Sequence, residues 1–336
     1  MSKVTIGLDV GGAHLKVARV VGSGVMAVRQ IAWPLWQGLD ELDQSIREAA
    51  PLTDDADAFS VTMTGELTEI FESREAGVLA ILDRLRDRLS GDLRIYMGLK
   101  GLAPPDTAAS DPLSVASANF LATAALVARL RPRSLLIDMG STTTDIIACD
   151  RPLGLTDSER LQTGELVYTG FTRTAVPSIA TRAPLAGQWQ SLARDAFANM
   201  ADVRRILGTL PDDVDQHATA DGRGKTQKES LERFARGFGR DADLRHLSTW
   251  QVAAAYIEER QLRSMHDGVL QVLSRPGSNV QSVVAAGIGA PAATQIATRL
   301  AMPSENFGDL IESDDDQKLW ATRCAPAVAV ALLSNT

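Results

Sequence analysis

Alternating apolar and polar residues dominate the first third of the chain and predict strands, while apolar residues at three- and four-residue spacing predict helices. Gly22-Ser23-Gly24 supplies a turn between two of the strands. The expected strands are 4–10, 14–21, 25–33, 59–64 and 94–98, and the expected helices are 39–50, 75–90 and an apolar one over 114–130.

Beyond residue 185 the helical spacing takes over. Ala193, Ala196, Met200, Val203 and Leu207 lie on one face of an expected helix over 189–208. Further elements are helices 227–238, 249–273, 291–300 and 322–333, a strand over 280–286 and a solvated acidic turn over 312–317. Strands and helices alternate within each half, which predicts a duplicated α/β fold with a cleft between two lobes.

One short pattern occurs twice, in residues 6–18 and 136–148, and we call these segments the first and second hairpin. Each has an apolar run, an Asp, one residue, a Gly, a polar turn and a second apolar run, so that Asp9 aligns with Asp138. A strand–turn–strand with Gly in the turn presents free backbone N–H groups, which bind phosphate oxygens, and a nearby carboxylate can hold a divalent cation. The alternative is two ordinary hairpins, and the matched motif argues against it.

Composition narrows the classes of function. The 336 residues carry a net charge of −8, with a pI near 5.1, which gives no basic field for nucleic acid or an anionic membrane. The N-terminus has no signal peptide and no apolar run reaches the length of a membrane span. Cys149 and Cys324 are expected to be buried thiols. We therefore expect a cytoplasmic monomer or homodimer.

The two hairpins, together with Gly287 and Gly289 in a strand-to-helix turn, resemble the actin-like ATPase (ASKHA) superfamily. The resemblance implies a duplicated actin-like, ribonuclease H-like fold with a central cleft. Residues 1–130 would form the first lobe, and a C-terminal helix at about 322–336 would pack back onto it. Residues 131–321 would form the second lobe, with a largely helical insertion at about 185–275.

A narrower resemblance is to the hydantoinase/oxoprolinase branch. The segments that carry it are Met63 to Leu67, Thr163 to Gly170 followed by Arg173-Thr174, Ala201 to Val203, and Thr219 to Lys225. Together they are similar to small proteins of tetrahydromethanopterin-linked one-carbon (C1) metabolism, whose archaeal members are methanofuran-precursor synthases. Amide-ring hydrolysis is not expected, because the chain is much shorter than true oxoprolinases and its four histidines are scattered.

The resemblance implies a reaction. A synthase of this kind joins an aminomethylfuran methanol diphosphate to the phenol of a γ-glutamyl-tyramine or γ-glutamyl-tyrosine acceptor and releases diphosphate, as in methylofuran or methanofuran assembly. It would be a transferase that uses Mg²⁺, with ATP or the substrate diphosphate in the inter-lobe cleft. The alternatives are an ATP-dependent small-molecule kinase and a non-catalytic, nucleotide-gated binding protein.

Candidate residues follow from the motifs and from the resemblance. Capping, turn-forming or surface roles compete at most of these positions, and His14 is read as incidental. Either Glu66 or Glu165 could take the phenol proton. The catalytic set is Asp9, Lys16, Glu66, Asp138, Asp145 and Glu165, with Asp9 and Asp138 holding Mg²⁺ directly or through water. The phosphate- or nucleotide-binding set is Gly11, Gly12, Gly140, Ser141, Thr142, Gly287 and Gly289, and the substrate-binding set is Tyr168, Arg173, Asp221, Gly222 and Arg223.

Overall fold

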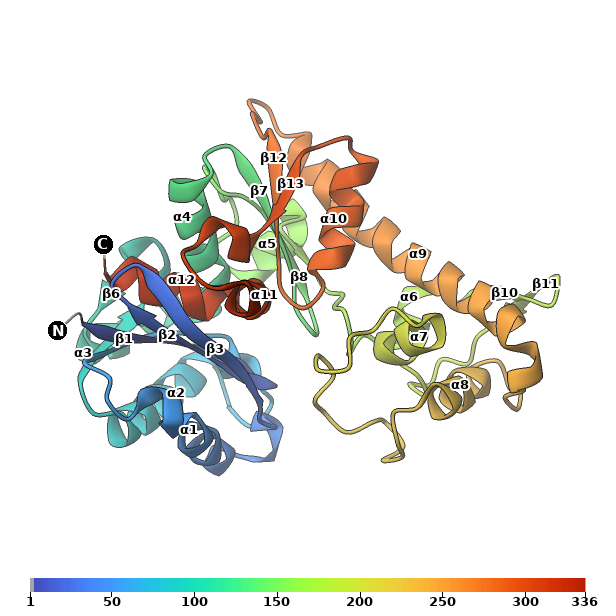
Figure 1. Cartoon of the computed structure of the whole chain (residues 1–336), viewed down its shortest axis with the longest axis horizontal. Helices are drawn as coiled ribbons and strands as arrows, with labels where there is room; N and C mark the ends of the chain where they lie inside the picture. Colours follow the sequence, from blue (N-terminus) through green and yellow to red (C-terminus); the bar gives the residue numbers. More distant parts are fainter. Residues whose placement is uncertain (1–2, 336) are drawn as a thin grey trace.

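The computed structural model describes residues 3–335 and places the two hairpins in two separate sheets (Figure 1). The first sheet has the order β3-β2-β1-β4-β5-β6. Its first hairpin is antiparallel, whereas β1 pairs with β4, and β4 with β5, in parallel. The strands are β1 (Val4–Val10), β2 (His14–Val21), β3 (Gly24–Ala32), β4 (Ala58–Met63), β5 (Asp92–Tyr96) and β6 (Leu102–Ala103).

Helices cover both faces of this sheet. The helices α1 (Asp40–Thr53) and α2 (Arg74–Arg88) share one apolar core with it, joined by the short α3 (Pro105–Ala109). On the opposite face lie α4 (Asn119–Leu130) and the C-terminal α12 (Ala325–Ser334). The chain packs so closely here that a Cβ on Gly7 would lie 1.9 Å from the carbonyl oxygen of Ala327. Only glycine fits under the helix at that point.

The second sheet repeats the plan in the order β13-β12-β7-β8-β9. Its central strands β7 (Ser134–Met139) and β8 (Thr144–Ala148) form the second hairpin, and β7 pairs with β12 in parallel. The other strands are β9 (Leu166–Val167), β12 (Ser282–Ala286) and β13 (Ser304–Asn306), and the helices are α5 (Asp157–Thr163), α10 (Ala290–Arg299) and α11 (Asp315–Arg323). The predicted α/β fold with a duplicated plan is confirmed, because each of the two sheets contains an equivalent antiparallel hairpin.

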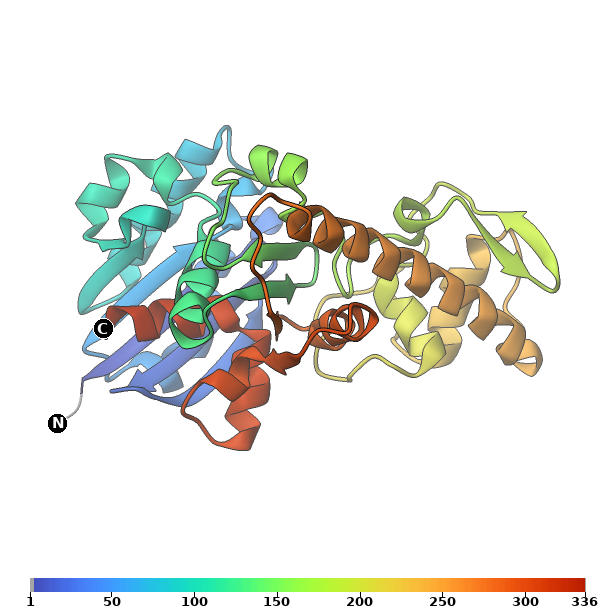
Figure 2. The same cartoon turned by 90° about the horizontal axis from the view of Figure 1, so that it is seen from above.

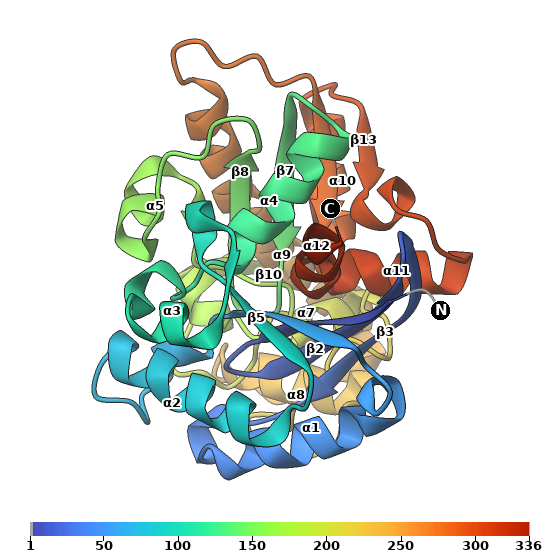
Figure 3. The same cartoon turned by 90° about the vertical axis from the view of Figure 1, so that its left-hand side faces the viewer.

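The two lobes share a core. In Figure 3, α12 and α4 lie between the two sheets. Side chains of both helices form one apolar cluster with residues of β2 on one side and of β7 and β8 on the other, including Val20, Leu136 and Ile147. The hairpins are therefore held at a fixed separation by buried helices, with their turns facing one cavity.

Residues 176–257, which we call the arm, extend away from the second sheet (Figures 1 and 2). The arm has its own apolar core, and its long helix α9 continues into the core of the second lobe. Its elements are α6 (Val176–Ile179), β10 (Arg182–Leu185), β11 (Gln188–Ser191), α7 (Met200–Leu207), α8 (Gln227–Arg236) and the first part of α9 (Leu247–Leu273).

The predicted helix over 189–208 is wrong in its first half. Residues 182–191 form a β-hairpin through Ala186 and Gly187, both with positive φ. The helix begins only after Asn199, whose side chain accepts a hydrogen bond from the Asp202 N–H in a capping box. The apolar spacing at 193 and 196 is coincidental, and the Asn-x-x-Asp pair was the better start signal.

Three other boundaries differ from expectation. The helix predicted over 114–130 begins at Asn119, after a 3-10 turn at Pro112–Ser114 and the positive φ of Ser117. The helix predicted over 322–333 is two helices that meet at Cys324. The acidic turn instead begins α11, with Asp314 as its N-cap. Both cysteines are buried and free, as predicted. Within residues 3–335, no helix has the length and apolar character needed to cross a bilayer.

Candidate active site

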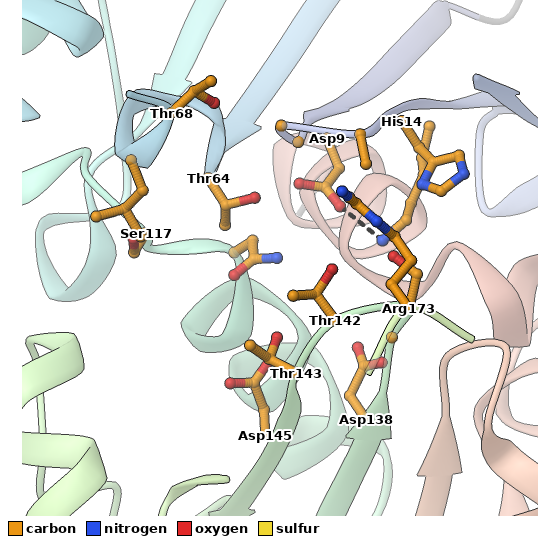
Figure 4. Close-up of a pocket in the computed structure, with 18 of the residues that line it drawn as sticks. Asp9, His14, Thr64, Thr68, Ser117, Asp138, Thr142, Thr143, Asp145 and Arg173 are labelled. Atoms are coloured by element: carbon orange, nitrogen blue, oxygen red, sulfur yellow. Dashed lines mark hydrogen bonds and ion pairs between the residues drawn. The ribbon is translucent and has the colours of Figure 1, made fainter. Parts of the chain in front are cut away.

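A cavity of about 640 Å³ lies between the lobes and is lined by both hairpins. Figure 4 shows side chains of the first hairpin and of the second hairpin facing one another across it. The predicted site residues that it brings together are Asp9, Gly11, Gly12, Lys16, Asp138, Gly140, Ser141, Thr142, Asp145, Tyr168 and Arg173. The structure thus places residues up to 164 positions apart in the sequence on one surface.

The two turns have the same backbone geometry. The N–H of Gly11 donates to the carbonyl of His14 at 3.0 Å, and the N–H of Gly140 donates to the carbonyl of Thr143 at 2.9 Å. The N–H groups between these bonds belong to residues that line the cavity. Such turns offer concave sets of amides to an anion, and two of them face the same space.

Asp9 and Lys16 are paired across the first hairpin. The Lys16 ammonium donates to Asp9 Oδ2 at 3.0 Å, and the Asp9 side chain is 2% exposed. Burial alone would lower the pKa of Lys16, but the carboxylates of Asp9 and Asp138 outweigh it and raise that pKa. Lys16 therefore stays charged at neutral pH and points a cation into the cleft. Asp9 Oδ1 is buried without a partner among the described residues.

Asp138 occupies the equivalent position in the second hairpin but has a different environment. Burial, with smaller effects from Asp145 and Asp9, outweighs the attraction of Lys16 and raises the pKa of Asp138 to about 7. The turn after β12 packs directly on it. A Cβ on Gly287 would lie 2.5 Å from Asp138 Oδ1, and Gly287 has a φ of +78°. Gly287 therefore positions this carboxylate and does not itself line the cleft.

Asp145 has the same place in the second hairpin that Lys16 has in the first, seven residues after the aspartate of the shared pattern, but its carboxylate is already paired. It lies opposite Asp138 in the β7–β8 register, and its carboxylate accepts a hydrogen bond from Arg160. Arg160 also pairs with Asp157 at 2.6 Å and stacks on Phe120 at 3.8 Å. Burial still raises the pKa of Asp145. A protein cation already neutralises this carboxylate, so the structure gives Asp145 less freedom to bind a metal than Asp138.

Asp9 and Asp138 fit a magnesium ion. Mg²⁺ prefers oxygen ligands and is commonly held by one or two carboxylates, with substrate phosphates and water completing its shell. Asp9 offers an unpartnered buried oxygen, and Asp138 lines the same cavity. In residues 3–335 no group of three or more His, Cys, Asp or Glu side chains forms a metal site. The cleft therefore suits a cation that arrives with a phosphorylated substrate.

Arg173 supplies a second cation. Its backbone N–H donates to the Ser141 carbonyl at 2.9 Å, which ties it to the second hairpin, and its guanidinium stacks on Trp36 at 5.0 Å. No carboxylate pairs with it within the described part of the chain. Burial lowers its pKa, but an arginine remains protonated at neutral pH. An unpaired guanidinium in a cleft is suited to an anionic ligand.

Glu66 lies just behind the cleft wall. It is 1% exposed and accepts hydrogen bonds from Ser117 at 2.8 Å and from Arg74 at 3.3 Å, and burial raises its pKa. Ser117 lines the cavity, whereas Glu66 does not. Glu66 is thus placed to orient Ser117, and its position does not favour direct contact with a substrate.

Glu165 is enclosed in the second lobe, outside the cavity. Its carboxylate accepts hydrogen bonds from the backbone N–H groups of Leu153 and Gly154, at 2.9 and 2.7 Å, and from Thr163 at 2.9 Å. Arg275 pairs with it at 2.9 Å. All its hydrogen-bonding capacity is used to hold the loop before α5. The prediction that Glu165 acts as a base is not supported by its place in the fold.

Glu165→Gln should therefore reduce stability and spare catalysis. Loss of the charge-assisted bonds to Arg275 and two amides is expected to lower the free energy of unfolding by about 1–3 kcal/mol. Urea unfolding would measure this, and kcat for any reaction of the cleft should stay within about threefold of the natural protein. A loss of kcat without a loss of stability would instead place Glu165 in the chemistry.

The other predicted residues outside the cavity have structural surroundings. Asp221 accepts from Arg233 at 3.1 Å and from the Arg223 backbone, while Arg223 pairs with Glu232 at 2.7 Å. Gly222 has a φ of +68° and lies at a turn in the loop between α7 and α8 of the arm. Gly289 packs on Met139, where a Cβ would lie 2.5 Å from the sulfur. The loop touches the cleft wall through His217, which does not line the cavity itself but packs on the lining residues His14 and Trp36.

Sequence reasoning missed several cleft residues. They are His14, which was read as incidental, and Gln30, Trp36, Thr64, Thr68, Ser117, Asn119, Arg160 and Arg323. Thr64 had a usable signal, because it follows β4 and the ends of neighbouring parallel strands meet at one edge. Arg323 had none, since its place depends on α11 packing near the arm, where it pairs with Asp213 at 2.6 Å.

Comparison with known proteins finds a matching family and two related proteins. A family model described as hydantoinase/oxoprolinase matches residues 57–334. The chain is 28% identical over 293 residues to the (4-{4-[2-(gamma-L-glutamylamino)ethyl]phenoxymethyl}furan-2-yl)methanamine synthase of Methanocaldococcus jannaschii, covering 86% of this chain and 87% of that one. It is 30% identical over 105 residues to the synthase of the same name from Methanococcus vannielii, covering 30% of this chain and 47% of that one.

Among solved structures, the chain is similar to component A of the (R)-2-hydroxyglutaryl-CoA dehydratase of Acidaminococcus fermentans. The TM-score is 0.44 at 14% identity, over 98% of this chain and 97% of that one. It is also similar to a ROK family glucokinase of Streptomyces griseus, solved with glucose and AMPPNP, with a TM-score of 0.44 at 14% identity and 98% of both chains covered.

Proposed function

The chain belongs to the hydantoinase/oxoprolinase family, and on that premise we propose that it is a synthase of methylofuran or methanofuran assembly. It would join an aminomethylfuran methanol diphosphate to the phenol of a γ-glutamyl-tyramine or γ-glutamyl-tyrosine acceptor and release diphosphate. The observation that carries the proposal is a single cavity with two opposed amide-rich turns, the paired cation Lys16 and the unpaired cation Arg173. The relative from Methanocaldococcus jannaschii supports the substrate class.

In this reaction the protein mainly stabilises the leaving group. Cleavage of the bond between the furfuryl carbon and the diphosphate oxygen leaves negative charge on diphosphate, and the furan oxygen shares the positive charge by resonance. The N–H groups of Gly11 and Gly140 close the two turns, so the backbone amides of Gly12, Ser141 and Thr142, which are already oriented, would bind that charge without reorganisation. Asp9 and Asp138 would hold Mg²⁺, which neutralises charge on diphosphate when it is bound.

Charged and aromatic side chains would provide the remaining contacts with the two substrates. Lys16 on the first hairpin and Arg173, which is tied to the second hairpin through Ser141, would contact diphosphate oxygens. Tyr168 is 68% exposed on the cleft wall and offers a ring face to an aromatic substrate. The predicted carboxylate-binding role of Arg223 does not enter the proposal, because that side chain is paired with Glu232 in the arm.

The test follows both products. Pure protein with Mg²⁺ is incubated with the furan methanol diphosphate and γ-glutamyltyramine or γ-glutamyltyrosine, with and without ATP, and mass spectrometry detects the ether and released diphosphate. Ether formed without ATP would establish the synthase. ADP formed with an acceptor, and no ether, would support a kinase. ATP hydrolysis without an acceptor would favour a nucleotide-gated binding protein.

Arg173→Met should weaken diphosphate binding. Removing one charge-assisted contact is expected to cost about 1.5–3 kcal/mol, which is roughly a 10- to 100-fold rise in the KM of the furan diphosphate. Steady-state kinetics would measure it.

The chain provides a matched control. Arg182 also stacks on a tryptophan, with its guanidinium 4.8 Å from the ring of Trp189, but it lies in the arm. Arg182→Met should leave this KM unchanged. Equal effects of the two substitutions would mean that the stacking, and not the anion, accounts for the loss.

A further inference from the structure

We propose that His14, His217 and Trp36 form the subsite for the acceptor phenol, and that His14 takes the phenol proton. The inference rests on the proposed function and deepens it by naming the base and the place of the acceptor ring. Neither Glu66 nor Glu165, the predicted bases, lines the cavity, whereas His14 does.

His14 lies in the cleft wall, next to the hairpin turns that would bind the diphosphate. It lies two residues before Lys16 on β2, and residues two apart on a strand point to the same face. Its side chain is therefore on the same face as the Lys16 ammonium, and it lines the same cavity as Asp9 (Figure 4). Only 6% of its surface is exposed, and its Nε2 has no hydrogen-bond partner in residues 3–335. A buried imidazole nitrogen without a partner costs free energy unless a ligand satisfies it.

His217 faces His14 from the arm. The ring centroids are 4.6 Å apart and the ring planes are inclined at 61°, and the Trp36 ring centroid lies 5.4 Å from that of His217. The Nε2 of His217 also has no partner among the described residues. A hydrogen bond of 3.3 Å between Gln30 and Gln216 holds the arm loop against β3. Segments 203 positions apart thus bring two imidazole rings together at the part of the cleft wall that His14 lines.

These rings suit a neutral, flat ligand that carries a hydroxyl group. Trp36 lines the cleft and is 40% exposed, so its ring is available for stacking. An imidazole nitrogen with a free lone pair accepts a hydrogen bond from a phenol O–H. A phenol held there would have its oxygen beside the hairpin turns that bind the diphosphate. That is the arrangement needed for its attack on the furfuryl carbon.

The charges around His14 keep it neutral. Burial, followed by His217 from the arm, Lys16 from β2 and Arg173 beside the second hairpin, lowers the pKa of His14 well below its usual range. Its free base is therefore the form present at neutral pH, ready to accept a proton. As the phenol oxygen forms its bond to the furfuryl carbon, the carbon–diphosphate bond breaks. The phenol proton moves to His14 Nε2, and diphosphate leaves with the bonding electron pair.

His14→Gln tests the base. Glutamine keeps a polar side chain in place but does not accept a proton, so kcat/KM for the acceptor is expected to fall about a hundredfold at pH 7.5. The matched control is His246→Gln, at a histidine exposed near the start of α9, where no change is expected. Thermal unfolding of both variants checks that they fold.

A second acceptor separates catalysis from packing. A polyfluorinated analogue of γ-glutamyltyramine, whose phenol is already ionised at the assay pH, no longer needs a base. With it, His14→Gln should come within about threefold of the natural protein. If the hundredfold loss persists with this acceptor, His14 is only structural, and a variant as active as the natural protein with both acceptors also overturns the assignment.

The natural protein gives an independent readout if the variant does not fold. Because the pKa of His14 lies well below its usual range, kcat/KM for the ordinary acceptor should decline only on stronger acidification, and this decline should be much weaker with an acceptor that is still ionised at those pH values. The same decline with both acceptors would overturn the role of His14. Failure of the proposed function looks different, because the natural protein would then form no ether with either acceptor at any pH.

Discussion

Asp138→Asn is expected to reduce ether formation about a thousandfold while leaving the protein as stable as the natural chain or more so. The carboxylate is one of two that would hold Mg²⁺ on the diphosphate, and electrostatic stabilisers of this kind are worth roughly 10²–10³ in rate each. The effect on the free energy of unfolding has the opposite sign, because the buried, ionised carboxylate destabilises the folded state. The asparagine side chain has nearly the same shape and no charge.

The pH dependence of this effect follows from the pKa. The pKa of Asp138 rises from an ordinary 3.8 to about 7 on folding, with burial as the largest cause. The folded state therefore holds this proton more tightly than the unfolded state, and its contribution to stability is lost as pH rises from about 4 through 7. Urea unfolding with a chelator present should show Asp138→Asn more stable than the natural chain by about 2–4 kcal/mol at pH 8, and little different at pH 4.

Asp9→Asn is the matched control, since it makes the same chemical change on the opposite hairpin. Asp9 is the partner of Lys16, and its loss leaves a largely buried ammonium without its nearest counter-charge. We expect unfolding to become easier by about 3 kcal/mol, together with a comparable loss of activity. Equal stability changes in the two variants would contradict the different environments of Asp9 and Asp138.

The parts of this site that could be predicted are those encoded locally. The strand–turn–strand hairpins follow from alternating residues and a glycine within a few positions, and their repetition identified Asp9 and Asp138 as equivalent. The shared turn geometry at Gly11 and Gly140 follows from the same local pattern. No tertiary contact is needed to infer any of these features.

The parts that failed depend on distant segments. His14 was read as incidental because its meaning comes from His217, which only the fold of the arm brings to it. Glu165 was read as a base because the sequence does not reveal Arg275 and the two backbone amides that enclose it. The helix predicted over 189–208 followed two coincidental alanines, although a capping pair marked the true start at Asn199. For His14 and Glu165 a tertiary neighbour changed the role of the residue, whereas the start of the helix was marked by a local signal.

Gly170→Ala is expected to lower kcat/KM at least about a hundredfold, although Gly170 is not a lining residue. A Cβ there would lie 2.3 Å from the backbone of Ser141 and of Thr142, a distance that real Cβ atoms do not adopt. Backbone atoms do not rotate out of the way, so the second hairpin turn must shift. The neighbouring bonds from Phe171 N–H to the Gly140 carbonyl and from Arg173 N–H to the Ser141 carbonyl, both 2.9 Å, would shift with it.

The loss should come from geometry rather than unfolding, because overpacking of this kind costs about 1–3 kcal/mol in stability. Both the amides that receive the diphosphate and the Arg173 guanidinium are displaced relative to Lys16 and Asp9, and a displacement near 1 Å is enough to cost about a hundredfold in rate. Kinetics and urea unfolding on the same preparations would separate the two effects. Gly24→Ala, where the nearest atom would be 3.6 Å from the new Cβ, is the control and should change neither. A fully active Gly170→Ala protein would mean that the second turn does not hold the diphosphate, and the first hairpin would have to bind it alone.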